Sequence, residues 1–179
     1  MNRITTTIAA AFIAATTGQV EAQETSDVFD LSQHGAWTVQ LEVFPNDLVR
    51  CNLSSLSTQE GRSEAPFYIT VDAEEKYVLY WMVRGAAAHG RVTIDAIMRV
   101  GRTTWTMHEA AVRDLGGALV FMFGIPEGQH HEFVADFMRG NDIQIDYDDG
   151  DLAELWSLHG SADAFRAFEE CQLRIQPTY

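Results

Sequence analysis

Metal-ligating side chains are most concentrated at His130-His131-Glu132, which is followed by Asp136. These residue types could bind zinc. Two histidine ligands on one helical face must lie three or four residues apart, because adjacent positions point about 100° apart. We therefore interpret the cluster as the solvated start of a helix and expect no metal ligand in it.

An acidic run from Asp146 to Asp151 has the oxygen-rich chemistry that calcium prefers. An EF-hand loop places acidic groups at its first, third and fifth positions, before a glycine. Counted back from Gly150, those positions hold Ile145, Tyr147 and Asp149. The run is better explained as a hairpin turn, with weak calcium binding in another geometry as the alternative.

Ser157, His159 and Ser161 lie close together in the sequence. The G-x-S-x-G pattern of a serine nucleophile is absent, and Ser161 is well placed to cap the helix that follows it. We assign no catalytic residue from this group.

A hydrolase could still use carboxylates and histidines that are distant in sequence, for example His108, Glu109 and Asp95. Such a site cannot be recognised without geometry, so this alternative stays open. The sequence has no glycine-rich phosphate loop, and we expect no cofactor. Four glycines expected at strand edges are explained more simply by positive backbone angles: Gly35, Gly85, Gly90 and Gly101.

The sequence has two cysteines, Cys51 and Cys171, and therefore only one possible disulfide. That bond would close a loop of about 120 residues and stabilise the fold by somewhat more than 4 kcal/mol in the chain-entropy estimate. The alternative is two buried free thiols.

The N-terminus has the order of a secretory signal peptide. The single charge in Met1-Asn2-Arg3 precedes an uncharged stretch from Ile4 to Thr17. This stretch is shorter than the roughly 20 residues that span a bilayer. Val20-Glu21-Ala22 predicts cleavage before Gln23 and a periplasmic or secreted product without a stable membrane anchor. A disordered or buried N-terminal helix is the alternative.

We expect residues 1–22 to be the signal peptide, 23–32 a flexible lead-in, and 33–179 one β-rich domain. The formal net charge is −14, and Lys76 is the single lysine. Nucleic-acid binding is disfavoured because it depends on clustered Lys and Arg. The acidic surface favours solubility and could steer a basic protein partner towards the domain.

Alternating apolar and polar residues predict a series of strands, and the run at 77–83, which is apolar throughout, predicts a central strand covered on both faces. The expected strands cover residues 37–43, 49–53, 67–71, 77–83, 92–98, 104–107, 118–123, 143–147 and 152–158. Four tryptophans fall in these strands, and a core role is favoured over ligand stacking: Trp37, Trp81, Trp105 and Trp156.

Helical spacing of apolar residues predicts two short packed helices, at about 128–139 and 161–171, and Gly140 follows the first where a C-cap is expected. The tail could add an edge strand through Leu173 and Ile175. The predicted fold class is mainly β, an antiparallel sandwich or barrel-like sheet with two helices.

Two short motifs, Gly35-Ala36-Trp37-Thr38-Val39 and Arg50-Cys51-Asn52-Leu53, resemble the opening of the invasion-associated locus B family of exported bacterial proteins. The helix from Phe133 to Gly140, the hairpin at Ile143 to Tyr147 and the segment Leu155-Trp156-Ser157-Leu158 resemble its C-terminal half. The chain departs from the family at Leu41, where a cysteine is usual, and it lacks a middle cysteine pair.

The resemblance implies an exported, all-β, non-enzymatic domain that is associated in pathogens with host-cell interaction. It carries over no catalytic residues. Our leading hypothesis is an extracytoplasmic binding domain with a protein partner. A periplasmic inhibitor of a basic hydrolase such as lysozyme is the second hypothesis, and a hydrolase with an unrecognised carboxylate and histidine site is the third.

Overall fold

The computed structural model describes residues 26–56, 65–71, 76–84, 90, 92–115, 118–147 and 154–175. Within these residues ten strands form a single sheet in the order β1-β2-β3-β4-β5-β8-β7-β6-β9-β10. The strands are β1 (Asp27–His34), β2 (Trp37–Val43), β3 (Val49–Leu56), β4 (Pro66–Val71), β5 (Tyr77–Arg84), β6 (Thr93–Val100), β7 (Thr103–Asp114), β8 (Ala118–Gly124), β9 (Asp142–Tyr147) and β10 (Glu154–Ser157). The helices are a 3-10 turn η1 (Glu127–Gln129), α1 (His130–Arg139) and α2 (Ser161–Ile175).

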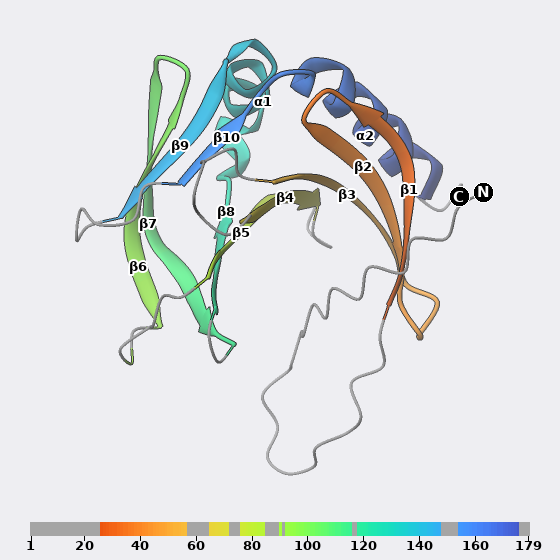
Figure 1. The fold of residues 1–179 in the computed structure, drawn as a ribbon, viewed down its shortest axis with the longest axis horizontal. Helices are drawn as coiled ribbons and strands as arrows, with labels where there is room; N and C mark the ends of the chain where they lie inside the picture. Colours follow the sequence, from red (N-terminus) through yellow and green to blue (C-terminus); the bar gives the residue numbers. More distant parts are fainter. Residues whose placement is uncertain are drawn as a thin grey trace.

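All strand pairs in this sheet are antiparallel. The sheet curves strongly, and the two helices lie together against one side of it (Figure 1). It does not close into a barrel, because β1 and β10 are its two edges. The predicted mainly β fold with two packed helices is confirmed.

The core is built from large aromatic side chains on the helix side of the sheet. Trp37 contacts Phe67 and Phe137, with ring centroids 6.0 and 4.8 Å apart. Phe67 in turn packs on Trp156, and Phe137 on Phe165. Each such pair contributes about 0.5–1.5 kcal/mol beyond its buried area. All four tryptophans are buried, which confirms their predicted core role.

Helix α2 is longer than predicted. Leu173 and Ile175 lie in its last turn, so the edge strand expected there is wrong. Ile175 is partly buried against the core and follows Cys171 by one helical turn, which continues the buried stripe. Within the described residues, no helix is long and apolar enough to cross a membrane.

Both predicted cap residues make further contacts: Gly140 is the C-cap of α1, as predicted, and its backbone N–H donates to the Asp136 carbonyl at 2.8 Å. The Ser161 hydroxyl, which was predicted to cap α2, donates to the Phe137 carbonyl over 2.9 Å and so joins α2 to α1. Gly140 has φ −68° and is therefore not in the left-handed region. A Cβ there would stand 2.7 Å from Leu158 Cδ1, which makes close packing the reason for glycine.

The predicted lead-in over residues 23–32 is corrected by the structure from residue 27 onward. Residues 27–34 form β1, which pairs with β2 along its length and shows a bulge between Asp30 and Ser32. Strand β7 is also longer than the predicted 104–107. The signal peptide over 1–22, residues 23–25 and the turn between β9 and β10 lie outside the described residues.

Candidate functional site

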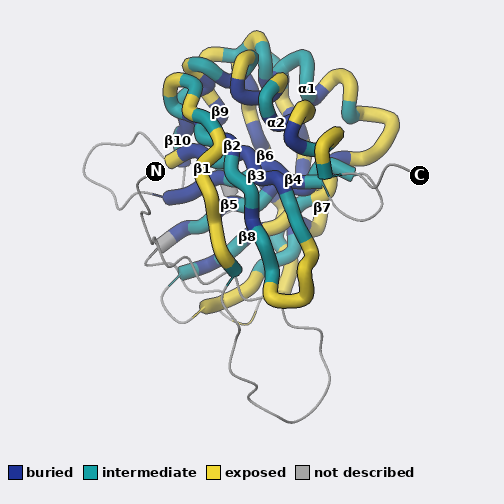
Figure 2. The backbone as a smooth tube through the Cα atoms, turned by 90° about the vertical axis from the view of Figure 1, so that its right-hand side faces the viewer, coloured by how far each residue is buried: buried dark blue, intermediate teal, exposed yellow. Residues whose placement is uncertain are grey.

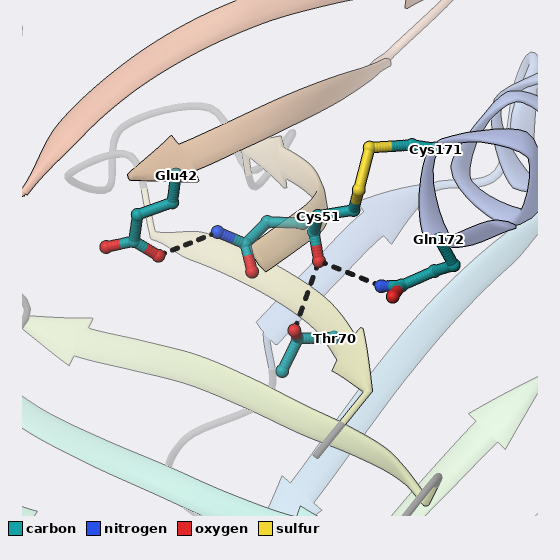
Figure 3. Close-up of a disulfide and its surroundings, with 6 residues drawn as sticks. Glu42, Cys51, Thr70, Cys171 and Gln172 are labelled. Carbon is teal, nitrogen blue, oxygen red and sulfur yellow. Dashed lines mark hydrogen bonds between the residues drawn. A yellow bond between two sulfur atoms is a disulfide. The ribbon is translucent and has the colours of Figure 1, made fainter. Parts of the chain in front are cut away.

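The two cysteines form the predicted disulfide, which joins β3 to α2. The Cα atoms of Cys51 and Cys171 lie 6.1 Å apart, and both residues are buried. The Cys51 carbonyl accepts hydrogen bonds from the Thr70 hydroxyl at 3.1 Å and the Gln172 amide at 3.3 Å. Figure 3 shows the Cys51 sulfur directed at α2. This bond fixes the last helix to β3.

Glu42 is a buried carboxylate on the sheet face opposite Cys51. It accepts hydrogen bonds from Ser26 at 2.7 Å, Arg50 at 2.6 Å and Asn52 at 2.9 Å. Burial opposes ionisation, but these hydrogen bonds and the Arg50 charge together lower the pKa of Glu42 below 4.5. Because these three donors surround both oxygens, we interpret this cluster as structural.

The structure brings together the three residues of the hydrolase hypothesis. Asp95 Oδ1 accepts the Glu109 backbone N–H at 2.8 Å, and Asp95 Oδ2 lies 3.5 Å from His108 Nδ1. The contact arises at a bulge between β6 and β7, where Glu109 has φ 55°. The backbone hydrogen bond from Glu109 lowers the pKa of Asp95, desolvation opposes this, and His108 lowers the pKa further. The side chains of His108 and Asp95 are 75% and 49% exposed, so they form a surface cluster.

Ser157, His159 and Ser161 are not arranged for nucleophilic catalysis. The Ser157 hydroxyl accepts the His159 backbone N–H at 3.1 Å, and the Ser161 hydroxyl is engaged with Phe137. The His159 carbonyl accepts the backbone N–H of Ala36 at 3.0 Å. These residues form the turn that carries the chain from β10 into α2.

His130 begins α1, and its Nε2 lies 2.9 Å from the Ile125 carbonyl, while its ring packs on Tyr77. His131 and Glu132 are exposed on the same first turn. In the part of the chain that the structure describes, no three His, Cys, Asp or Glu side chains are grouped closely enough to hold a metal ion. Asp146 pairs with Arg99, whereas the rest of the acidic run, from Asp148, lies outside that part.

An open groove of about 710 Å³ lies between the β1–β2 edge of the sheet and α2. Its floor is apolar and includes Cys171, Val39 and Leu41. Its α2 side carries two ion pairs, Asp163 with Arg166 at 2.6 Å and Glu170 with Arg174 at 3.6 Å. The β1 side is formed by Leu31, Ser32 and His34. The groove is thus an apolar trough with a charged rim.

Strand β1 is exposed over most of its length, as its yellow tube in Figure 2 shows. Phe29 and Leu31 are 51% and 52% exposed, and Leu173 on α2 is 70% exposed. Sequence reasoning missed this strand because the bulge breaks the two-residue period. The signal that could have found it is Gly35, whose φ of 60° makes the tight turn into β2.

Fold and site define a disulfide-linked domain built on a single curved antiparallel sheet, with an exposed edge strand beside an apolar groove. Among solved structures, the chain is similar to invasion associated protein B from Bartonella henselae. The TM-score is 0.55, with 13% sequence identity over 79% of this chain and 96% of that chain. No protein-family model and no curated protein matches the sequence. The likeness shows a shared fold, in agreement with the resemblance found in the sequence.

Proposed function

We propose that this chain is an extracytoplasmic, non-enzymatic domain that binds a protein partner at the groove between β1 and α2. The observation that carries the proposal is the half-exposed pair Phe29 and Leu31 on an edge strand beside an apolar trough. Exposed apolar side chains that gather at a groove are typical of binding surfaces, whereas isolated ones are not.

The disulfide supports an extracytoplasmic location, because such bonds persist in oxidising compartments. Both sulfur-bearing residues are buried, as a structural bond requires. The similar Bartonella protein is named as invasion associated, and on that basis we propose host-cell association as the role of the binding activity.

The environment of Asp95 and His108 at the β6–β7 bulge does not favour a catalytic role for them. A general acid at neutral pH needs a raised pKa and a site that excludes water. Asp95 has a lowered pKa and an exposed side chain, and neither it nor His108 lines the groove. We therefore propose that this cluster shapes the bulge.

Site-specific photocrosslinking tests the binding function. A photoreactive residue placed at Leu31 of the oxidised protein should give a discrete adduct with an envelope fraction, whereas the same residue at Val92, which is 75% exposed, should not. Excess unlabelled protein should compete the adduct away, and the F29S/L31S variant should not. A Leu31 adduct that F29S/L31S competes equally well, or equal adducts at Leu31 and Val92, would refute this site.

Inhibition of a basic hydrolase is a second candidate, favoured by charge. The chain has a net charge of −14, and four of its arginines are already paired with its own carboxylates: Arg50, Arg99, Arg166 and Arg174. The oxidised protein should then inhibit lysozyme with a potency that falls as salt is added. Full lysozyme activity at low salt with excess protein would remove this candidate.

A further inference from the structure

The two edges of the sheet differ sharply. Strand β10 has four residues, with Glu154 and Trp156 buried. Strand β1 has eight residues, of which Asp27 to Leu31 are all exposed. Among the described residues, β1 pairs only with β2, so its outer backbone groups have no neighbouring strand there. An edge strand that is short and buried is protected against the addition of another strand. Strand β1 is neither short nor buried.

The side chains of β1 are suited to an added strand next to α2. Phe29 lies opposite Leu41 in the β1–β2 ladder, and Leu41 lines the groove. Because directly paired residues share a sheet face, Phe29 is on the groove side. A strand that paired with β1 would place every second side chain on this side, beside Phe29 and Leu31.

The charge of β1 selects the kind of partner. The strand contains Asp27 and Asp30 and has no Lys or Arg. The arginines on the α2 rim, Arg166 and Arg174, are already paired with acidic neighbours on the same helix. A second copy of this chain would place its own Asp27 and Asp30 against the same two residues, and each chain has a net charge of −14. This repulsion disfavours pairing between two copies. A cationic segment meets no such repulsion.

We infer that β1 is a docking strand for an extended, basic segment of a partner protein. The segment adds an eleventh strand to the sheet, places alternate apolar side chains over the groove, and places Lys or Arg near Asp27 and Asp30. This mode of binding rests on the proposed function and gives it a specific partner chemistry. The main chain of β1 contributes the hydrogen bonds, and the alternating pattern determines specificity.

The test uses a synthetic peptide of about ten residues with alternating Lys and Val, a length suited to strand addition, and the oxidised full domain. A first control peptide has the same sequence with N-methylated alternate amides, which cannot donate the strand hydrogen bonds. A second control has the same composition in two blocks. Binding is measured by calorimetry, and amide exchange reports which strand becomes protected.

We expect the alternating peptide to bind and both controls to bind at least about tenfold more weakly, equivalent to about 1.4 kcal/mol. Amide exchange at residues 27–31 should slow by a similar factor. D27N/D30N should weaken binding, whereas the matched E127Q/E132Q variant, with exposed carboxylates on η1 and α1, should not.

Equal binding of the N-methylated or block peptide would overturn strand addition and leave only charge attraction. Protection of residues 27–31 before any peptide is added would also overturn it, by showing that another segment or a second copy already covers the edge. The crosslinking experiment is independent of these outcomes. A Leu31 adduct without peptide binding would retain the groove as the site and reject only this mode of binding.

Discussion

Gly35 and His159 are in such close contact that a side chain on Gly35 would overlap the His159 carbonyl and ring. The same contact is reciprocal, because a Cβ on Gly160 would overlap the His34 carbonyl. Both glycines have positive φ, 60° and 85°. The β1–β2 turn and the turn before α2 therefore fit together through two glycines, and the Ala36 to His159 hydrogen bond closes the contact.

Gly35→Ala should lower the free energy of unfolding by at least about 2 kcal/mol, because overpacking adds to the cost of a positive φ. Urea denaturation measures the change. Gly128→Ala is the matched control, since a Cβ there meets nothing within 4 Å. Equal unfolding midpoints for the two variants would contradict the close contact.

Removal of the disulfide should destabilise the domain by about 4 kcal/mol in the chain-entropy estimate. C51A/C171A and the wild type with a reductant should show similar losses in thermal unfolding, since both remove the same cross-link. Alkylation without reduction provides the control. Labelling of both cysteines in the denatured but unreduced wild-type protein would show that the bond is absent.

Glu42 should make stability depend on pH. Its pKa is lowered in the folded state from 4.5, so its contribution is present above that value and is lost as the pH falls through the folded-state pKa. Glu42→Gln should destabilise at neutral pH by about 1.5–3 kcal/mol, the range for hydrogen bonds to charged groups. The gap between the two urea midpoints should narrow on acidification. A constant gap from neutral pH to about pH 3 would contradict this assignment.

Glu109→Gly should stabilise the domain by up to about 1 kcal/mol, because glycine relieves the positive φ at the β6–β7 bulge. Glu132→Gly in helix α1 should instead destabilise it by about 1 kcal/mol. Thermal unfolding of the two variants side by side provides the comparison. Destabilisation in both would indicate that Glu109 has no backbone strain to relieve.

Cleavage before Gln23 predicts the mass of the exported protein. Expression of the full chain in a bacterial host with a general secretion system should yield a periplasmic product that begins at Gln23. Intact-mass measurement checks it, and a cytoplasmic fraction from secretion-blocked cells is the control. An exported product that retains Met1 would refute the signal peptide.

Much of the fold was predictable because several strands keep a two-residue period and others, such as 77–83, are continuous apolar runs. Residues 37–43 alternate in sequence, and β2 covers the same range. The period fails at the two bulges, where an extra residue shifts the phase of the strand. One bulge hid β1, and the other hid the second half of β7.

Local sequence patterns also limited how much of the site could be predicted. The disulfide was predicted from the two cysteines together with the export signal, because an exported chain with two cysteines has one possible pair. The convergence of Asp95, His108 and Glu109 depends on the pairing of two strands at a bulge, which no local pattern specifies. The groove depends on β1 and on the last turn of α2, the two elements that the sequence pattern misassigned.

The separation of the two cysteines sets an order of events during chain delivery. In a chain that emerges from its N-terminal end, Cys51 is available long before Cys171, which follows it by 120 residues. The segments of seven further strands must emerge, and α2 must begin to form, before Cys171 is in place. Until then the Cys51 thiol must stay reduced or leave any temporary disulfide by exchange. Formation of the disulfide is therefore a late step, which follows the emergence of the segments that form all the described strands.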